Sequence, residues 1–209
     1  MARVNNYLIQ AAQAKQRFLT YDQNQIIAKF QLASDDDFLY ITLLCKPYRI
    51  HRATGDLQYL DGTWQDGNSH REVLTLFDLL CDSREHRFLS GRWRNTQSFG
   101  HQFHQSLLEE PEDPMAKAID ESPDAFRAAC LTLQAEPFPG GDMGYAIELF
   151  DGLKIGILFW HGDEEFAPRL RYLWDANATM YLRYETMYYA INLLERQLIH
   201  LMHTKEVNP

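Results

Sequence analysis

The dipeptide Asp151-Gly152 constrains the fold of this chain more than any other feature of its sequence. It joins two apolar runs, 145–150 and 153–160, and a two-residue Asp-Gly connection between such runs is a strong signal for a β-hairpin. The end of the second run, IGILFW, is apolar on both alternations, which predicts a central strand covered on both faces. Gly156 in this strand would let another group approach the backbone closely.

Two further elements after this hairpin complete a predicted core. Leu170, Tyr172 and Trp174 face one way, and Arg169 and Arg171 the other, as in a strand that is buried on one side. A long helix is predicted from Glu185 to about His203, because apolar residues recur there at spacings of four and three. Strands joined by short turns pair antiparallel. We therefore predict an α+β fold: an antiparallel β-sheet built from hairpins, with helices packed against it and a long C-terminal helix.

The first two thirds of the chain predict further helices and hairpins. Asp22 is placed to cap a short helical turn, and Ser69 and Glu72 have the spacing of a capping box. Residues 53–56 form a hairpin turn in which Gly55 is free to take a positive φ. The predicted helices cover 7–21, 70–82, 114–119 and 123–134, and the predicted strands cover 27–32, 38–45, 48–52 and 57–60.

The size of the chain suits one compact domain. It has 209 residues, of which 45% are hydrophobic and 13% aromatic, enough for a sizeable core. We expect a single α+β domain over residues 1–209, with an N-terminal helical segment over 1–30 and a helical insertion over 110–135.

Charge and cysteine usage exclude several classes of function. The formal net charge is -9, whereas nucleic acids and anionic membranes favour a basic face, so neither is expected as a partner. No signal-peptide core or membrane-length apolar run is present. Cys45, Cys81 and Cys130 are far apart and form no zinc or iron–sulfur motif. These observations predict a cytoplasmic protein with reduced cysteines.

Three short motifs each allow a functional interpretation and a structural one. The acids of 35–37 could suggest a calcium loop but lack its alternate spacing, which favours a turn. Gly140-Gly141 could suggest a phosphate cradle, but a strand follows it instead of the helix N-terminus that such cradles need. His101 and His104 could share a helix face as metal ligands, yet a site needs three or four ligands, which favours ordinary packed or exposed histidines.

The loop 161–168 is the strongest candidate for a functional site, because it leaves the end of a rigid strand. Its carboxylates and imidazole could bind a ligand or a hard metal, or perform acid–base chemistry. Their spacing matches no known ligand pattern, which favours the other interpretation: they form ion pairs with Arg169, Arg171 or Arg183 and only shape the loop. The tyrosines around Tyr184 could line a pocket or pack in the core. The candidate ligand-binding residues are Trp160, His161, Asp163, Glu164, Glu165, Asp175 and Tyr184.

Four ordered blocks of the sequence resemble a known family. They are LFDLLCDSREHRFLSGRW, PFPGGDMGYAIELFDGLKIGILFWHGDEEF, RLRYLWDANATMYL and YETMYYAINLLERQL. With the hairpin near 48–60 they resemble the bacterial and archaeal family catalogued as domain of unknown function 3786, over most of the chain after about Leu32. One departure is Ala167, where relatives often have proline.

The resemblance implies little about chemistry. Some relatives look fused to iron–sulfur domains and the family is common in anaerobes, which implies a role beside redox or corrinoid metabolism. This chain has no cysteine set for a cluster, so such a role would act through a partner.

No sequence motif identifies a reaction or a cofactor. There is no Ser-His-Asp order, nucleophile elbow or Walker motif. We therefore expect an accessory module that binds a small molecule, cofactor or partner protein at the loop. The alternative is a metal-assisted hydrolase or lyase that uses the acidic residues of 161–165. A purely structural or homo-oligomeric protein stays a third interpretation.

Overall fold

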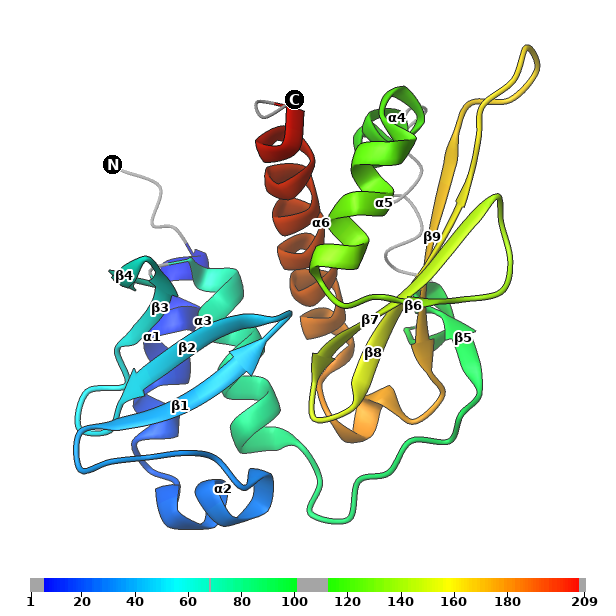
Figure 1. The fold of residues 1–209 in the computed structure, drawn as a ribbon. Helices are drawn as coiled ribbons and strands as arrows, with labels where there is room; N and C mark the ends of the chain where they lie inside the picture. Colours follow the sequence, from blue (N-terminus) through cyan, green and yellow to red (C-terminus); the bar gives the residue numbers. More distant parts are fainter. Residues whose placement is uncertain (1–5, 68, 101–112, 207–209) are drawn as a thin grey trace. The chain divides into compact units, whose positions relative to one another are not determined.

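The computed structural model describes residues 6–67, 69–100 and 113–206, and the chain divides into two compact units (Figure 1). The first unit runs to Phe88 and takes in Thr179–Ala190, and the second comprises Leu89–Ala178 and the chain from Ile191 onward. The predicted α+β fold with antiparallel sheets and a long C-terminal helix is confirmed, with the strands distributed over two sheets. The single-domain organisation stays a prediction.

The first unit is a four-stranded sheet with helices against it. The sheet is antiparallel throughout, in the order β1-β2-β3-β4. Its elements are α1 (Asn6–Phe18), α2 (Gln23–Phe30), β1 (Phe38–Leu43), β2 (Lys46–His51), β3 (Leu57–Asp61), β4 (Thr63–Asp66), α3 (His70–Phe77) and a π-helical turn η1 (Asp78–Asp82). The short 3-10 helix η4 (Ala178–Met180) precedes the start of α6 (Tyr184–Glu206), whose first turns belong to this unit.

One face of this sheet forms the core of the first unit. Leu39, Ile41 and Ile50 are buried because alternate residues of β1 and β2 turn to the same side. Helices α1 and α3 lie along that side in Figure 1, and the rings of Phe18 and Phe77 meet between them with centroids 4.8 Å apart. The hydrophobic contact between helix and sheet faces is the main stabilising term of such a layer.

Two local predictions for the first unit are wrong. Residues 27–30 are the end of helix α2 rather than the start of a strand, because the Asp22 carboxylate caps the amides of Asn24 and Gln25 and starts the helix early. Helix α3 does begin after Ser69, but the capping box does not form. The Glu72 carboxylate instead accepts a hydrogen bond of 2.8 Å from the buried Tyr48 hydroxyl, which needs a partner away from water.

The second unit contains a five-stranded antiparallel sheet in the order β5-β9-β8-β7-β6. Its elements are β5 (Trp93–Asn95), η2 (Thr96–Phe99), α4 (Pro114–Glu121), α5 (Pro123–Thr132), β6 (Glu136–Pro137), β7 (Met143–Phe150), β8 (Leu153–Trp160), β9 (Arg169–Asp175) and the later turns of α6. Strand β8 is central, as its two-sided apolar pattern predicts. Gly140 and Gly141 form a turn that leads into β7, both with positive φ.

The predicted Asp-Gly hairpin is confirmed. Asp151 and Gly152 both have positive φ, 52° and 77°, as the tight turn between twisted strands requires. Gly156 is also explained, since a Cβ there would lie 3.2 Å from the indole of Trp93 and 3.1 Å from the Cβ of Leu173. The strand therefore admits Trp93 against its backbone, and any larger residue would displace that indole.

The remaining predictions can be placed briefly. Asp35 caps its own turn by accepting hydrogen bonds from the amides of Asp37 and Phe38, which supports the turn interpretation. His101 and His104 lie outside the described residues. Among the helices that the structure describes, none is long and apolar enough to cross a membrane.

Candidate functional site

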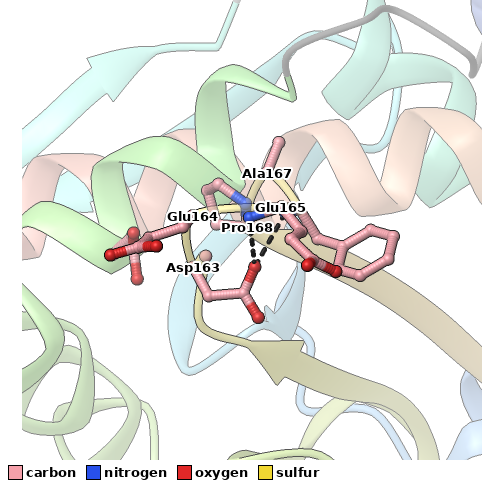
Figure 2. A pocket seen from close by; sticks show the side chains of 8 residues that line it. Asp163, Glu164, Glu165, Ala167 and Pro168 are labelled. Atoms are coloured by element: carbon pink, nitrogen blue, oxygen red, sulfur yellow. Dashed lines mark hydrogen bonds between the residues drawn. The ribbon is translucent and has the colours of Figure 1, made fainter.

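The loop between β8 and β9 is held by its first carboxylate. Asp163 accepts hydrogen bonds of 2.8 Å from the amides of Glu165 and Phe166, and its own amide donates to the Phe166 carbonyl. Figure 2 shows the Asp163 carboxylate turned toward the loop backbone, with both bonds as dashed lines. This is the local geometry that Asp adopts readily, because its short side chain reaches amides two and three residues on. Asp163 therefore shapes the loop.

The next residues of the loop present free groups to solvent. Glu164, Glu165 and Phe166 are all exposed, and the Phe166 side chain keeps 69% of its accessible surface. In the part of the chain that the structure describes, neither glutamate carboxylate has an ion-pair or hydrogen-bond partner, and in Figure 2 the Glu164 side chain extends away from Asp163. The predicted pairing with Arg169, Arg171 or Arg183 does not form among these residues.

A surface hollow of about 540 Å³ lies against this loop. It is lined by Asp120 from α4 and by Gly162–Pro168. The hollow is open and acidic on its rim, which suits an extended or protein surface better than an enclosed small molecule.

His161 is positioned by two acids that the sequence did not single out. Its Nδ1 lies 2.7 Å from the Asp120 carboxylate, and its backbone amide donates to Asp142 at 2.8 Å. The His161 and Phe159 rings pack edge to face, with centroids 5.0 Å apart. A carboxylate at Nδ1 orients an imidazole and leaves Nε2 as its outward group. His161 and Asp120 thus form a pair that can exchange a proton or receive a ligand.

Trp160 closes β8 beside the loop and is half-buried. The Arg171 guanidinium stands 5.5 Å from the centroid of its ring, within range of a cation–π contact. Arg171 is therefore engaged by an aromatic ring of the neighbouring strand.

Asp175 lies away from the loop and has a structural environment. It sits at the other end of β9, six residues beyond Arg169, which corresponds to about 20 Å of strand. Its buried carboxylate accepts hydrogen bonds from the Ser90 amide and hydroxyl, the Gly91 amide and the Asn177 amide. Burial opposes its charge, but these donors outweigh it and lower the pKa of Asp175 below its ordinary value.

Tyr184 belongs to the first unit, where α6 begins. Its phenol oxygen lies 2.6 Å from that of Tyr188, one helical turn on, with the rings edge to face. Burial and this neighbouring hydroxyl raise the pKa of Tyr188. The structure therefore places His161, Asp163, Glu164 and Glu165 on one loop, with Trp160 at the end of the strand that leads into it, while Asp175 and Tyr184 lie in separate environments.

A buried acid cluster in the first unit escaped the sequence interpretation. Asp78 and Asp82 share a hydrogen bond on the π-helical turn η1, between the guanidinium groups of Arg17 and Arg183. The Tyr21 hydroxyl donates to Asp82, and the Arg183 amide donates to Asp78 at 2.8 Å. Burial is the main cause that raises the pKa of Asp78, whereas the pKa of Asp82 is lowered, since hydrogen bonding and the two arginines outweigh its burial.

A signal for this cluster does exist in the sequence. Asp78 and Asp82 are four residues apart beside an apolar stripe, and like charges at that spacing destabilise a helix unless cations or a shared proton compensate. The compensating arginines come from distant segments, so the spacing alone cannot identify them.

Metal ligands and reactive thiols are not assembled in the described parts of the chain. Within residues 6–67, 69–100 and 113–206, no three His, Cys, Asp or Glu side chains are grouped so that they could hold a metal ion. Burial raises the pKa of the Cys81 and Cys130 thiols to about 12, which keeps both protonated and unreactive. Cys45 is exposed at the β1–β2 turn.

Comparison with known proteins bears on the family alone. No curated protein and no solved structure matches the chain. A family model described as a domain of unknown function, DUF3786, matches residues 22–196. This range includes every strand of both sheets and most of α6, and it agrees with the resemblance of the four sequence blocks. The chain therefore belongs to the DUF3786 family.

Proposed function

We propose that the protein is an accessory binding module whose loop 161–168 docks a partner protein. The observation that carries this proposal is the loop tip: two carboxylates without partners in the described structure directly precede an exposed phenylalanine on a backbone fixed by Asp163. An exposed aromatic side chain within a polar rim is the usual anchor of a protein interface. A fixed loop also loses little conformational entropy when it binds.

The chemistry of the loop specifies the partner's surface. On the partner's surface, we expect an apolar pocket that accommodates Phe166. We also expect lysine or arginine side chains at the rim of that pocket, where they would pair with Glu164 and Glu165. A link to anaerobic redox metabolism would come from such a partner, because the three cysteines of this chain are separate thiols.

Site-specific photo-crosslinking tests the proposal. A photoreactive phenylalanine analogue at position 166 is expected to give one discrete adduct in extract of the source organism. The matched control places the analogue at Leu131 on α5, an apolar side chain that is also exposed, at 64%. Equal adducts from both positions, or none from position 166, would contradict the docking role.

A second candidate is a hydrolase or lyase that uses acid–base chemistry, with or without a metal ion. The observation that favours it is the His161–Asp120 pair, because a carboxylate-oriented imidazole is a common general base and a common metal ligand. Turnover would then depend on His161 Nε2, and a metal would need further ligands from the substrate or the loop carboxylates.

Metal titration separates the two candidates. Untagged protein would be titrated with Mg²⁺, Mn²⁺, Zn²⁺ and Ca²⁺ while its thermal unfolding midpoint is followed. The docking proposal predicts that any metal-induced shift of the unfolding midpoint is the same in His161→Ala as in the unchanged protein. A saturable stabilisation that depends on His161 and Asp120 would favour the enzyme candidate instead.

A further inference from the structure

The sheet of the first unit carries a second, separate set of chemical groups. The pairing register places Phe38 opposite His51, Arg49 opposite Gln58, and Gln58 opposite Asp66. Because side chains alternate along a strand, these residues share the face of the sheet opposite to the buried Leu39, Ile41 and Ile50. The face is polar and aromatic, and its members are half-buried or exposed.

An aromatic and cationic stack makes this face rigid. The Arg49 guanidinium lies 4.2 Å from the ring centroid of Phe38 and 4.5 Å from that of Trp64. The His51 and Phe38 rings pack edge to face, with an interplanar angle of 86° and centroids 5.2 Å apart. Such contacts hold side chains in one rotamer and leave flat apolar surface beside them.

A chain of hydrogen bonds orients the polar groups on the same face. Arg49 Nε donates to Gln58 Oε1 at 2.8 Å, and Gln58 Nε2 donates to Asp66 Oδ1 at 3.1 Å. Since a guanidinium can only donate, the amide oxygen of Gln58 must face Arg49 and its nitrogen must face Asp66. Asp66 Oδ2 has no partner among the described residues, so it is the acceptor that this network leaves available.

His51 supplies the complementary donor. Its Nδ1 accepts a hydrogen bond of 3.2 Å from the Ala53 amide. A backbone amide can only donate, so the neutral ring must carry its proton on Nε2. His51 therefore has one remaining group, an N–H donor.

Of these groups, Phe38, His51, Gln58 and Asp66 line a hollow of about 450 Å³. Asp56 also lines it, but its carboxylate is occupied by the Thr54 hydroxyl at 2.7 Å and by Lys15 Nζ at 3.0 Å. We propose that this hollow binds a purine-sized nitrogen heterocycle with an exocyclic amino group. The ring would lie beside Phe38, accept from His51 Nε2 through a ring nitrogen, and donate from its amino group to Asp66 Oδ2.

The spacing of the strands supports a ligand of that size. His51 and Asp66 are two strands apart and two residues apart along the register, which corresponds to a Cα separation of about 12 Å. Two hydrogen bonds of about 3 Å leave room for one fused two-ring system between the side chains. The volume also falls in the usual range for small-molecule sites, about 300–1,000 Å³.

Saturation-transfer NMR on the full chain tests this site with nucleosides, which lack phosphates that the net charge of -9 would repel. Adenosine and guanosine are expected to show saturable transfer. Inosine has the purine ring without the amino group and is expected to bind about fivefold more weakly, because Asp66 Oδ2 then gains no donor. Absence of transfer from both amino-purines, or equal affinity for inosine, overturns the proposal.

One substitution should reverse the preference. In Asp66→Asn the side-chain oxygen is retained by Gln58 Nε2, so the new amide N–H faces the hollow and can donate to the inosine carbonyl. Inosine should then bind more tightly than adenosine, and an unchanged ranking contradicts the proposed contact. Asp66 is exposed, so this variant is expected to fold. Glu164→Gln/Glu165→Gln should leave nucleoside binding unchanged, since neither glutamate is among the residues that line the hollow.

Discussion

Two acidic regions of this protein look alike in the sequence and differ completely in the structure. In the first unit, Asp78 and Asp82 are enclosed by Arg17, Arg183, Tyr21 and backbone amides. In the second, Glu164 and Glu165 extend from a fixed loop without partners in the described chain. Enclosed carboxylates contribute to stability and free ones are available for binding. The donors that reach a carboxylate, arginines in one case and backbone amides in others, therefore separate structural acids from recognition acids, and local charge density does not.

The largest effect is expected at Asp78, the most deeply buried acid of the enclosed cluster. Asp78→Ala leaves the Arg183 amide without its acceptor and removes the hydrogen bond to Asp82, so it should lower the free energy of unfolding by about 3 kcal/mol. Asp78→Asn keeps an acceptor and an N–H donor, so it should lower the free energy of unfolding by less than about 1 kcal/mol. Urea denaturation at pH 7 measures both. Equal losses in the two variants would show that the hydrogen bonds do not account for the effect.

The next effect concerns Asp175, the enclosed acid of the second unit. Because its folded pKa is lowered, its stabilisation is present above about pH 4, the ordinary Asp value, and is lost as the pH falls through the folded pKa. Asp175→Asn should lower the free energy of unfolding by about 2 kcal/mol at pH 7. It should also make the loss of stability with falling pH less steep. Unfolding would be followed by urea denaturation from pH 7 to pH 3, with the exposed Asp36→Asn as the control. A decline of unchanged steepness in Asp175→Asn would contradict the assignment.

A smaller effect is expected at Asp163, which lies between the two classes. It is exposed like its neighbours, yet its carboxylate caps two amides of the loop. Asp163→Ala should lower the free energy of unfolding by about 1 kcal/mol, similar to the loss of a helix cap. Asp163→Asn keeps a side-chain oxygen that can accept from the loop amides and should therefore retain most of this stabilisation. Amide exchange at Glu165 and Phe166 reports the local change directly. Unaltered protection in Asp163→Ala would mean that other contacts fix the loop.

The smallest effect on stability is expected for Glu164 and Glu165, the two residues whose substitution should most weaken binding of the proposed partner protein. Glu164→Gln/Glu165→Gln should change the free energy of unfolding by less than about 0.5 kcal/mol, because neither carboxylate has a partner to lose among the described residues. The same urea titration measures this. A loss above about 1 kcal/mol would place these acids in the structural class.

The strands and helices were largely predictable because each depends on neighbours in the sequence. The Asp151-Gly152 turn, the two-sided apolar pattern of β8 and the Asp22 cap all use residues within a few positions of one another. Where a local pattern competed with a distant partner, the prediction was wrong. Glu72 is the clear case, since the buried Tyr48 hydroxyl from β2 takes the carboxylate that a capping box would use.

The position of the loop could be predicted from the sequence, but the contacts of its residues could not. The loop 161–165 could be identified because it follows a rigid strand, but nothing local indicates that His161 meets Asp120 or that Arg183 pairs with Asp78. Those partners lie 41 and 105 residues away in the chain. Asp175 was grouped with the loop because it is close in sequence, whereas the length of β9 separates it in space.

The most direct test of the account is the crosslinking yield of the charge-neutral loop. The photoreactive analogue at position 166 would be combined with Glu164→Gln/Glu165→Gln and compared with the same analogue in the otherwise unchanged chain. Loss of two rim ion pairs should reduce the adduct about tenfold while the unfolding midpoint stays the same. An undiminished adduct, or a loss that accompanies unfolding of the protein, would contradict a recognition role for these two carboxylates.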